Sequence, residues 1–303
     1  MTRWAVVVAT DGNLLDEATR MLDEVARTAT GAPDLFCFAR DLDDTQQGRL
    51  ARVPRLTVLP IGSGEVPVGP MPTYASEGEP SVFYARFECW SDRFAAYDTI
   101  VYLDVDTVVL GDLSPLTAYD FYASAEIDGS SPFVDEDDPA LATLMEADGW
   151  RGPVGVRVNA GVFAIGRAWR TAEQRELLRR ITDRYAPYLR EGDQSVLVLW
   201  MHANGIAGSA DASYNCQIRR TVGRPGGRAA VRRARVLHCN GMKLATQRVA
   251  LRNARLWLGV PMVGRDLFVL THRALFDDRK MRPRARRVLE LGAGLRHLSL
   301  IHI

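Results

Sequence analysis

Two aspartates separated by one residue follow an apolar stretch in the segment IVYLDVDTVVL, residues 100–110. An unpaired carboxylate is costly to bury, so Asp104 and Asp106 each require water, a basic partner or a cation. We expect the preceding apolar residues to form a buried strand, whose alternation would point both carboxylates to the same side. Two carboxylates at a strand end form a hard oxygen site that suits Mn²⁺ or Mg²⁺.

Three interpretations of this pair are open at this point. The first is a metal site whose remaining positions a diphosphate could fill. The second is a pair of acids that caps the following turn. The third is the nucleophile and the acid/base of a haloacid dehalogenase-type phosphatase, whose first motif also places Asp-x-Asp after an apolar strand. That family usually begins near this motif, whereas here three predicted strands precede Asp104. No convincing lysine or paired-acid motif follows it either. We therefore rank the phosphatase second, behind the metal site.

Composition indicates an ordinary globular protein with enough chain for a large core, because 303 residues contain 47% hydrophobic and 25% charged side chains. No apolar run reaches about 18 residues, so we expect no membrane-spanning helix. The first apolar run leads into Asp-Gly-Asn without a small-residue cleavage site, which favours a first strand over a signal peptide. The four cysteines are far apart, which fits reduced thiols in a cytoplasmic protein.

The net charge of +1 hides a strong asymmetry. Residues 217–303 contain 20 basic and 4 acidic side chains, whereas residues 1–216 contain 18 basic and 33 acidic ones. The basic part could bind phosphates, an anionic glycan or the inner face of a membrane, or it could be a solvated arginine-rich face. Pro283, Gly292 and Gly294 weaken a long amphipathic helix near the end of the chain. Peripheral membrane contact is therefore left open for a cytoplasmic protein.

Hydrophobic periodicity predicts alternating strands and helices, hence an α/β fold with a mostly parallel central sheet and flanking helices. Strands are expected at 4–10, 34–39, 55–60, 100–103, 121–127, 159–166 and 233–241. Helices are expected at 14–28, 81–98, 139–148, 168–187 and 193–203. A short connector would join the second and third strands. Residues 62–80 should form a long loop, and residues 128–157 an insertion over one end of the sheet.

Several motifs occur in an order that resembles glycosyltransferase family 8, which includes glycogenin and the bacterial lipooligosaccharide galactosyltransferases. The longest is YARFECWSDRFAAYDTIVYLDVDTVVLGDLSPL, residues 84–116. The others are ATDGN after the first strand, NAGVFAIG, GDQSVL, SYN and LHCNG, which together extend from residue 5 to about residue 243. One such motif is weak evidence, but this many in order are specific.

The resemblance implies a GT-A fold, which is Rossmann-like, with a catalytic domain at 1–245 and a basic helical extension at 246–303. It implies a retaining, metal-dependent hexosyltransferase that uses a UDP-sugar such as UDP-glucose or UDP-galactose. The acceptor would be a glycan, a lipid-linked glycan or another hydroxyl compound, and no nucleic acid would be bound. A sugar-nucleotide-binding protein without catalysis is a further alternative.

For the donor nucleotide, the resemblance implies contacts at the end of the first strand and near the aspartates. The residues concerned are Ala9, Thr10, Asp11, Asn13, Arg86, Asp104 and Val105. The segment after the first strand would hold uracil and ribose, although an Asp-Gly turn or a helix cap is the alternative there. Arg86 would lie near the donor sugar and the phosphates, whereas a lone helical arginine is usually solvated.

For the donor sugar, the resemblance implies Asn159 and Ala160, followed by Gly161, with small side chains that let a hexose approach the main chain. Asp193 and Gln194 would lie beneath the anomeric carbon as catalytic residues, with Asp193 on sugar hydroxyls and Gln194 facing the reacting centre. The alternative for both is an ordinary helix cap. Because an amide is a poor nucleophile, we expect same-face attack by the acceptor rather than a covalent intermediate.

His238 is implied as the third metal ligand beside Asp104 and Asp106, and imidazole with two carboxylates suits Mn²⁺ somewhat better than Mg²⁺. A lone histidine at a strand end is otherwise more often structural. Gly241 would leave room for the diphosphate and Lys243 would bind it. Lys243 follows Gly241 by two residues rather than the three of the family, and the usual Pro-Trp is missing. An arginine of the basic tail is an alternative phosphate ligand, and this departure is the best support for a protein without catalysis.

Overall fold

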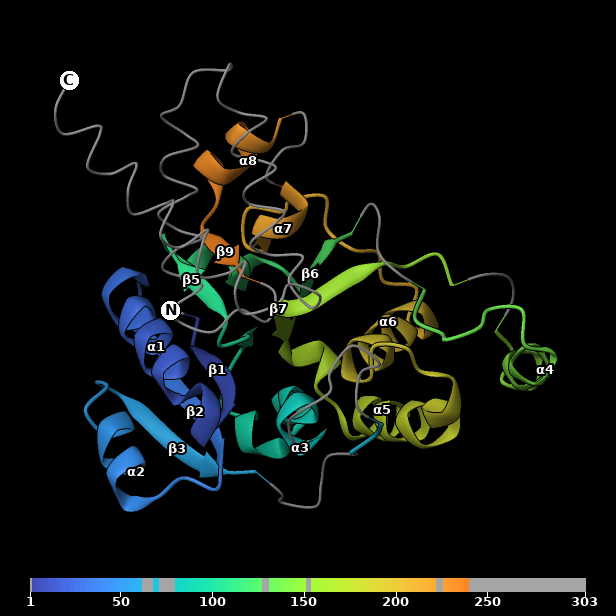
Figure 1. Ribbon diagram of the computed structural model, residues 1–303, viewed down its shortest axis with the longest axis horizontal. Helices are drawn as coiled ribbons and strands as arrows, with labels where there is room; N and C mark the ends of the chain where they lie inside the picture. Colours follow the sequence, from blue (N-terminus) through green and yellow to red (C-terminus); the bar gives the residue numbers. More distant parts are fainter. Residues whose placement is uncertain are drawn as a thin grey trace, which may run out of the picture.

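A six-stranded sheet with the order β3-β2-β1-β4-β7-β6 forms the centre of the molecule (Figure 1). The computed structural model describes residues 2–61, 68–70, 80–126, 131–150, 154–221 and 226–239. The strands are β1 (Trp4–Asp11), β2 (Asp34–Arg40), β3 (Leu56–Pro60), β4 (Thr99–Leu103), β6 (Phe121–Ala125) and β7 (Val158–Gly166). Strands β3, β2, β1 and β4 are parallel, while β7 runs antiparallel to β4 and β6. The expected mostly parallel α/β sheet is confirmed.

A second, three-stranded sheet brings together segments that are distant in the sequence. Its order is β5 (Thr107–Val109), β9 (Val236–His238) and β8 (Cys216–Gln217). Strand β9 is antiparallel to β5 and parallel to β8. Of these strands, only β9 is expected from the sequence, as part of the longer stretch 233–241, because the segments of β5 and β8 are too short to establish a period. The expected strand at 233–241 is shortened to three residues, and its last two positions lie outside the described part of the chain.

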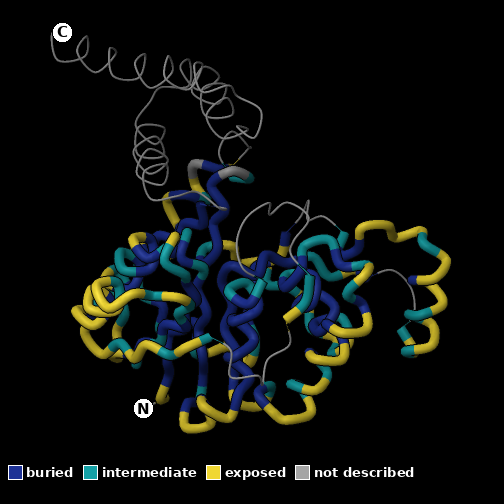
Figure 2. Tube along the Cα trace, turned by 60° about the horizontal axis from the view of Figure 1, so that its bottom comes forward, coloured by how far each residue is buried: buried dark blue, intermediate teal, exposed yellow. Residues whose placement is uncertain are grey.

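Helices cover both faces of the large sheet, as expected for this class of fold. They are α1 (Leu15–Thr28), α2 (Asp44–Leu50), α3 (Pro80–Tyr84), α4 (Pro139–Ala147), α5 (Ala172–Tyr185), α6 (Asp193–Ala203), α7 (Ile218–Thr221) and α8 (Gly227–Arg233). Along β1, Val6 and Val8 pack in one core with α1, whereas Val7 packs in the other core with α5 and α6. Figure 2 shows the buried trace through the middle of the molecule and the exposed residues in its outer loops.

The expected single helix at 81–98 is wrong. Only α3 is α-helical, and it continues as two 3₁₀ segments, Ala85–Trp90 and Asp92–Phe94. The aromatic residues explain the difference, because a 3₁₀ helix has three residues per turn and aligns positions three apart. Tyr84 packs edge to face on Phe87, which packs in the same way on Trp90, each pair at 5.9 Å between ring centres. All three side chains are buried in this row.

Other expectations are corrected in detail. Helix α2 takes the place of the short connector, and its Asp43 cap and Gln46 form a reciprocal capping box. Helix α5 starts at residue 172 rather than 168, because the Thr171 side chain caps it and accepts from the backbone N–H of Gln174, one of the free N–H groups of the first turn. The expected short helix at 139–148 is present as α4, but it lies at the periphery beyond α6 rather than over the sheet (Figure 1).

Two further expectations concern the state of the cysteines and membrane-spanning helices. All four cysteines lie in the described part of the chain and are buried free thiols. None of the helices in the described ranges is long and apolar enough to cross a membrane. The expected loop at 62–80 and the basic extension at 246–303 lie almost wholly or wholly outside those ranges, so the domain boundary at residue 245 stays a prediction.

The packing of β7 in the larger core generates a stability prediction. Phe163 is fully buried, stacks on Tyr102 at 5.1 Å and lies 5.6 Å from Trp90. We expect Phe163→Ala to lower the free energy of unfolding in urea by about 3–5 kcal/mol, because it leaves a cavity in the core. Val134→Ala is the control, since Val134 is 51% exposed and its truncation should change this free energy by about 0.5 kcal/mol or less. Equal losses in the two variants would contradict the described core.

Candidate active site

A tight turn, rather than a strand, carries the two aspartates. Strand β4 ends at Leu103 and β5 begins at Thr107. Thr107 closes the turn, since its N–H and its hydroxyl both donate to the carbonyl of Asp104, at 3.1 and 2.8 Å. The N–H of Asp104 donates to the carbonyl of Gly161 on β7 at 2.7 Å. The expectation that strand alternation orients both carboxylates is therefore wrong, because the turn brings them together.

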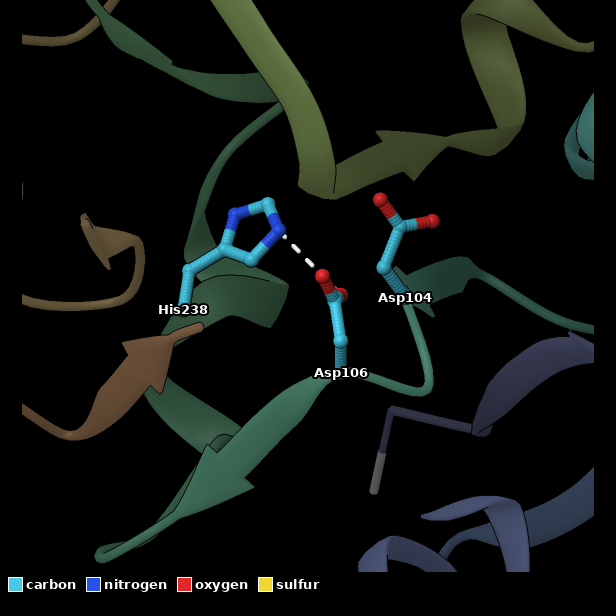
Figure 3. Close-up of side chains that lie close together, drawn as sticks. All are labelled: Asp104, Asp106 and His238. Atoms are coloured by element: carbon cyan, nitrogen blue, oxygen red, sulfur yellow. Dashed lines mark ion pairs between the residues drawn. The ribbon is translucent and has the colours of Figure 1, made fainter. Parts of the chain in front are cut away.

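The second sheet places His238 beside this turn. His238 at the end of β9 lies opposite Thr107 in the antiparallel register, and the N–H of Cys239 donates to the carbonyl of Asp106 at 2.9 Å. Nε2 of His238 lies 3.2 Å from Oδ1 of Asp106. One ligand atom each from Asp104, Asp106 and His238 lie within 4.8 Å of one another, and Figure 3 shows the three side chains converging. Two carboxylate oxygens and one imidazole nitrogen fit a divalent cation such as Mn²⁺.

The electrostatics of this cluster favour positive charge. Burial of the His238 ring by itself lowers its pKa, but the carboxylates of Asp106 and Asp104 outweigh that effect, and the pKa is raised above its ordinary value. The ring is 3% exposed, so water screens these charges weakly. A buried place where two carboxylates stabilise a positive charge is also a place where they stabilise a metal cation.

Arg86 connects the turn to the start of α6. Its Nε lies 2.7 Å from Oδ2 of Asp193 and its Nη2 lies 2.9 Å from Oδ1 of Asp104. Its Nη1 donates to the carbonyl of Ala160 at 2.8 Å, and its guanidinium lies over the Tyr102 ring at 5.0 Å. Arg86 is 5% exposed, so the alternative of a solvated arginine is wrong.

Asp193 is buried at the first position of α6. Gly192 precedes it with a φ of +53°, which a side-chain-bearing residue rarely adopts, and this turn directs Asp193 inward. Burial raises the pKa of Asp193 to about 7, although the Arg86 guanidinium acts in the opposite direction. The carboxylate contacts Arg86 rather than solvent.

Gln194 lies beside Asn159 and Ala160, as the sequence predicted for residues around one site. Its Oε1 accepts from the N–H of Ala160 and from Nδ2 of Asn159, both at 3.1 Å. Its Nε2 donates to the carboxylate of Glu191. The amide of Gln194 is thus held by protein groups at both ends.

Gly161 is required for a reason that the sequence did not predict. A Cβ atom at this position would lie 2.2 Å from Cε1 of His238 and 2.9 Å from Oδ1 of Asn159. The imidazole therefore occupies the space that a side chain would need. His238 is a close neighbour that requires a glycine here, and the approach of a hexose to this segment stays a prediction.

Asn215 was not among the predicted site residues. It is 1% exposed, and its Nδ2 donates to the backbone carbonyl and to Oδ1 of Asn159 at 3.2 and 2.9 Å. Its Oδ1 lies 2.9 Å from Nδ1 of His238. The signal available in the sequence was the Ser-Tyr-Asn segment, which belongs to the resemblance but was given no role.

The predicted nucleotide-binding residues divide into buried and exposed groups. Ala9, Thr10 and Val105 are buried. Asp11 caps the 3₁₀ turn after β1 and accepts from the N–H groups of Asn13 and Leu14 at 2.9 and 3.2 Å, so the cap alternative is present. Since β1 is parallel to β4, its carboxyl end lies at the same edge of the sheet as Asp104. Gly241 and Lys243 lie outside the described residues.

Comparison with known proteins agrees with this architecture. The model of the family described as Glycosyl transferase family 8 matches residues 75–244, which include Arg86, both aspartates and His238. A search of curated proteins finds no match.

Solved structures of glycosyltransferases share the fold. Galactosyltransferase LgtC, solved with donor and acceptor sugar analogues, is 18% identical with a TM-score of 0.55, over 86% of this chain and 99% of that one. The bifunctional glycosyltransferase WbbM is 17% identical with a TM-score of 0.59, over 80% of this chain and 46% of that one, so this chain spans less than half of it. GlyE of Streptococcus pneumoniae TIGR4 is 19% identical with a TM-score of 0.50, over 86% and 64% of the two chains. At these identities the likeness is one of fold.

The buried ion pairs generate a prediction with a pH dependence. Arg86→Ala leaves Asp193 buried without its guanidinium partner, and we expect the free energy of unfolding to fall by about 3–5 kcal/mol at pH 8. A raised folded-state pKa means that the folded protein binds more protons than the unfolded one, so stability falls as pH rises from about 4 to the folded pKa. Without Arg86 that pKa rises further, and the loss should be smaller at pH 6 than at pH 8.

The control for Arg86 is Arg179→Ala on α5, where the arginine pairs with Glu176 and Asp183 at the surface. This variant should unfold like the parent at both pH values. Urea titrations at pH 6 and pH 8 measure all three proteins. A loss for Arg86→Ala that is the same at both pH values would contradict the assignment of a buried, proton-accepting Asp193.

The space next to His238 generates a second prediction for the site. Gly161→Ala forces the imidazole aside, and we expect Mn²⁺ affinity to fall by about 10–100-fold, the effect typical of disturbing a metal ligand's support. Titration of the free protein with Mn²⁺, followed by electron paramagnetic resonance, measures the affinity. Gly48→Ala is the control, because nothing lies within 4 Å of a Cβ at that position. Unchanged binding in Gly161→Ala would mean that His238 is not a ligand.

Proposed function

Because this chain belongs to glycosyl transferase family 8 and is a glycosyltransferase, we propose that it transfers a hexose from a UDP-sugar to the hydroxyl group of a glycan acceptor. The donor would be UDP-glucose or UDP-galactose, the configuration at the anomeric carbon would be retained, and the acceptor could be lipid-linked. The observation that carries the proposal is the convergence of Asp104, Asp106 and His238 within 4.8 Å at the edge of the sheet.

Asp104, Asp106 and His238 would hold Mn²⁺, or Mg²⁺, at this edge. When bound, the cation acts as a Lewis acid that stabilises the negative charge of the departing UDP. Arg86 holds one oxygen of Asp104 at 2.9 Å and so restricts how that carboxylate can turn. The fixed carboxylate and the rigid turn would orient the diphosphate in advance, which lowers the cost of charge development.

The sugar would lie over the start of α6 and β7. Asn159, Ala160 and Asp193 lie together there and carry amide, backbone and carboxyl groups of the kinds that bind sugar hydroxyls. Gln194 is a poor nucleophile, and its Oε1 already accepts two hydrogen bonds. This occupancy supports same-face attack by the acceptor over a covalent glycosyl-enzyme.

The nucleotide would extend from the aspartates towards the end of β1. The carboxylate of Asp11 and the exposed amide of Asn13 are suited to the edge of uracil and to ribose hydroxyls. Gly241 and Lys243 remain candidates for the diphosphate by resemblance alone. By the same argument, residues 1–245 would form the catalytic domain, and the basic residues 246–303 would give a cytoplasmic protein peripheral contact with an anionic membrane.

Two alternatives weighed on the sequence are not favoured by the family match, namely a dehalogenase-type phosphatase and a sugar-nucleotide-binding protein without catalysis. The phosphatase would release phosphate from small phosphoesters without UDP. The binding protein would keep UDP affinity and show no turnover.

The function is tested by UDP binding followed by turnover. We expect UDP at about 100 times its Kd to raise stability by about 2.7 kcal/mol when Mn²⁺ is present, and to have little effect after chelation. In a panel of UDP-hexoses, one donor should be hydrolysed in the presence of Mn²⁺. Asp106→Asn should lower this hydrolysis by about 10²–10³-fold, because it removes a negative charge that binds the cation next to the leaving group.

The control is Asp183→Asn, an exposed aspartate on α5 that pairs only with surface groups among the contacts described. It should hydrolyse the donor at the parent rate. Metal-dependent UDP binding without hydrolysis of any donor would favour the binding protein, and hydrolysis unaffected by Asp106→Asn would refute the proposed metal site.

A further inference from the structure

We propose that Asn215 is a positioning residue that couples the cation site to Gln194. Asn215 and Asn159 form a chain of amides from His238 to Gln194, which we call the amide chain. The amide chain determines which nitrogen of His238 faces the two aspartates, and it holds Gln194 in a matching orientation. The inference rests on the proposed function, in which His238 is a cation ligand and Gln194 faces the sugar.

Three backbone groups at the start of β7 determine the direction of each amide. A backbone N–H can only donate and a backbone carbonyl can only accept. The N–H of Gly161 meets Oδ1 of Asn159 at 3.0 Å, so the oxygen of that amide must point to it. The N–H of Ala160 meets Oε1 of Gln194 at 3.1 Å, which orients Gln194 in the same way.

Asn215 is oriented by the backbone carbonyl of Asn159. That carbonyl accepts from Nδ2 of Asn215 at 3.2 Å, and Oδ1 of Asn159 accepts from the same nitrogen at 2.9 Å. A reversed amide would place the oxygen of Asn215 against two other oxygens. The oxygen of Asn215 must therefore face His238.

The tautomer of His238 follows from this orientation. Nδ1 of His238 lies 2.9 Å from Oδ1 of Asn215, and an amide oxygen can only accept. Nδ1 must therefore carry a proton, so in the neutral form of the ring, the form that binds a metal, the lone pair of Nε2 is the one directed at the aspartates. A metal-binding imidazole requires a free nitrogen on the metal side, and a partner of the other nitrogen is what supplies it.

At its other end, the amide chain reaches Gln194. Nδ2 of Asn159 donates to Oε1 of Gln194 at 3.1 Å, and Nε2 of Gln194 donates to Glu191. Every member from His238 to Asn159 is at most 8% exposed, so water cannot readily replace a lost hydrogen bond. A change at either end therefore has to be accommodated along the whole chain.

The test is Mn²⁺ binding to the metal-free protein, followed by electron paramagnetic resonance, which does not depend on turnover. Asn215→Leu removes the acceptor for Nδ1, and we expect Mn²⁺ affinity to fall by about 10–100-fold. Asn215→Asp keeps an acceptor for Nδ1 but loses the donor to Asn159, so its Mn²⁺ affinity should fall less than that of Asn215→Leu. A merely structural role of Asn215 would weaken both variants alike.

The matched control is Asn204→Leu at the end of α6. Asn204 also makes two side-chain hydrogen bonds, to the carbonyl of Trp200 and with Gln174, but it lies outside the amide chain. Its Mn²⁺ affinity should equal that of the parent. If Asn215→Leu does not fold, Asn215→Ser takes its place, because the shorter hydroxyl cannot reach Nδ1.

The coupling to Gln194 is tested in a double-mutant cycle of Mn²⁺ affinity. Gln194→Leu removes no cation ligand, yet we expect a measurable fall, and the double variant with Asn215→Leu should lose less than the product of the two single factors. A parent that does not bind Mn²⁺ would refute the proposed function itself. A parent that binds, with Asn215→Leu unchanged or with multiplicative losses, would leave that function standing and refute the coupling.

Discussion

At its functional edge, the structure has to compensate the repulsion between two carboxylates that a three-residue turn holds close together. Asp104 and Asp106 can be kept close only if positive charge lies between or beside them. Arg86 supplies a positive charge beside Asp104. On the other side, the raised pKa of His238 means that the carboxylates favour a positive charge on its ring. In this arrangement the protein groups partly offset the repulsion, and a divalent cation would complete the compensation. The site is therefore electrostatically suited to a divalent cation.

The surrounding elements can be understood as supports of this one arrangement. Strand β7 contributes backbone groups of Ala160 and Gly161 to the arginine and to the turn, and it has a glycine where the imidazole needs space. The small sheet of β5, β9 and β8 brings His238 to the turn. The start of α6 adds a carboxylate whose pKa burial raises to about 7, so Arg86 binds two acids of different character. Several of these supports are buried polar contacts, and such contacts stabilise a unique geometry only when all are satisfied.

Much of the fold was predictable from periodicity, since buried strands such as β1 and amphipathic helices such as α1 have strong patterns. The proximity of the Asp-x-Asp pair to His238 followed from motif order. Motif order did not predict four other features. These are the turn at Asp104, the 3₁₀ segments after Tyr84, the burial of Arg86 and the hydrogen bonds of the Asn215 amide. Each depends on contacts between segments distant in the sequence, and local propensity carries no information about which segment will be the neighbour. For Gly161 the residue type was informative, but its neighbour could be identified only in three dimensions.

The central claim is that one divalent cation binds between Asp104, Asp106 and His238 and anchors a uridine nucleotide. A crystal of the protein grown with Mn²⁺ and UDP, measured at the manganese absorption edge, tests it most directly. The account predicts a single strong anomalous peak in contact with one oxygen of each aspartate and with Nε2 of His238, and with the diphosphate on its open side. A peak elsewhere, or bound UDP with no anomalous signal at this edge of the sheet, would contradict it.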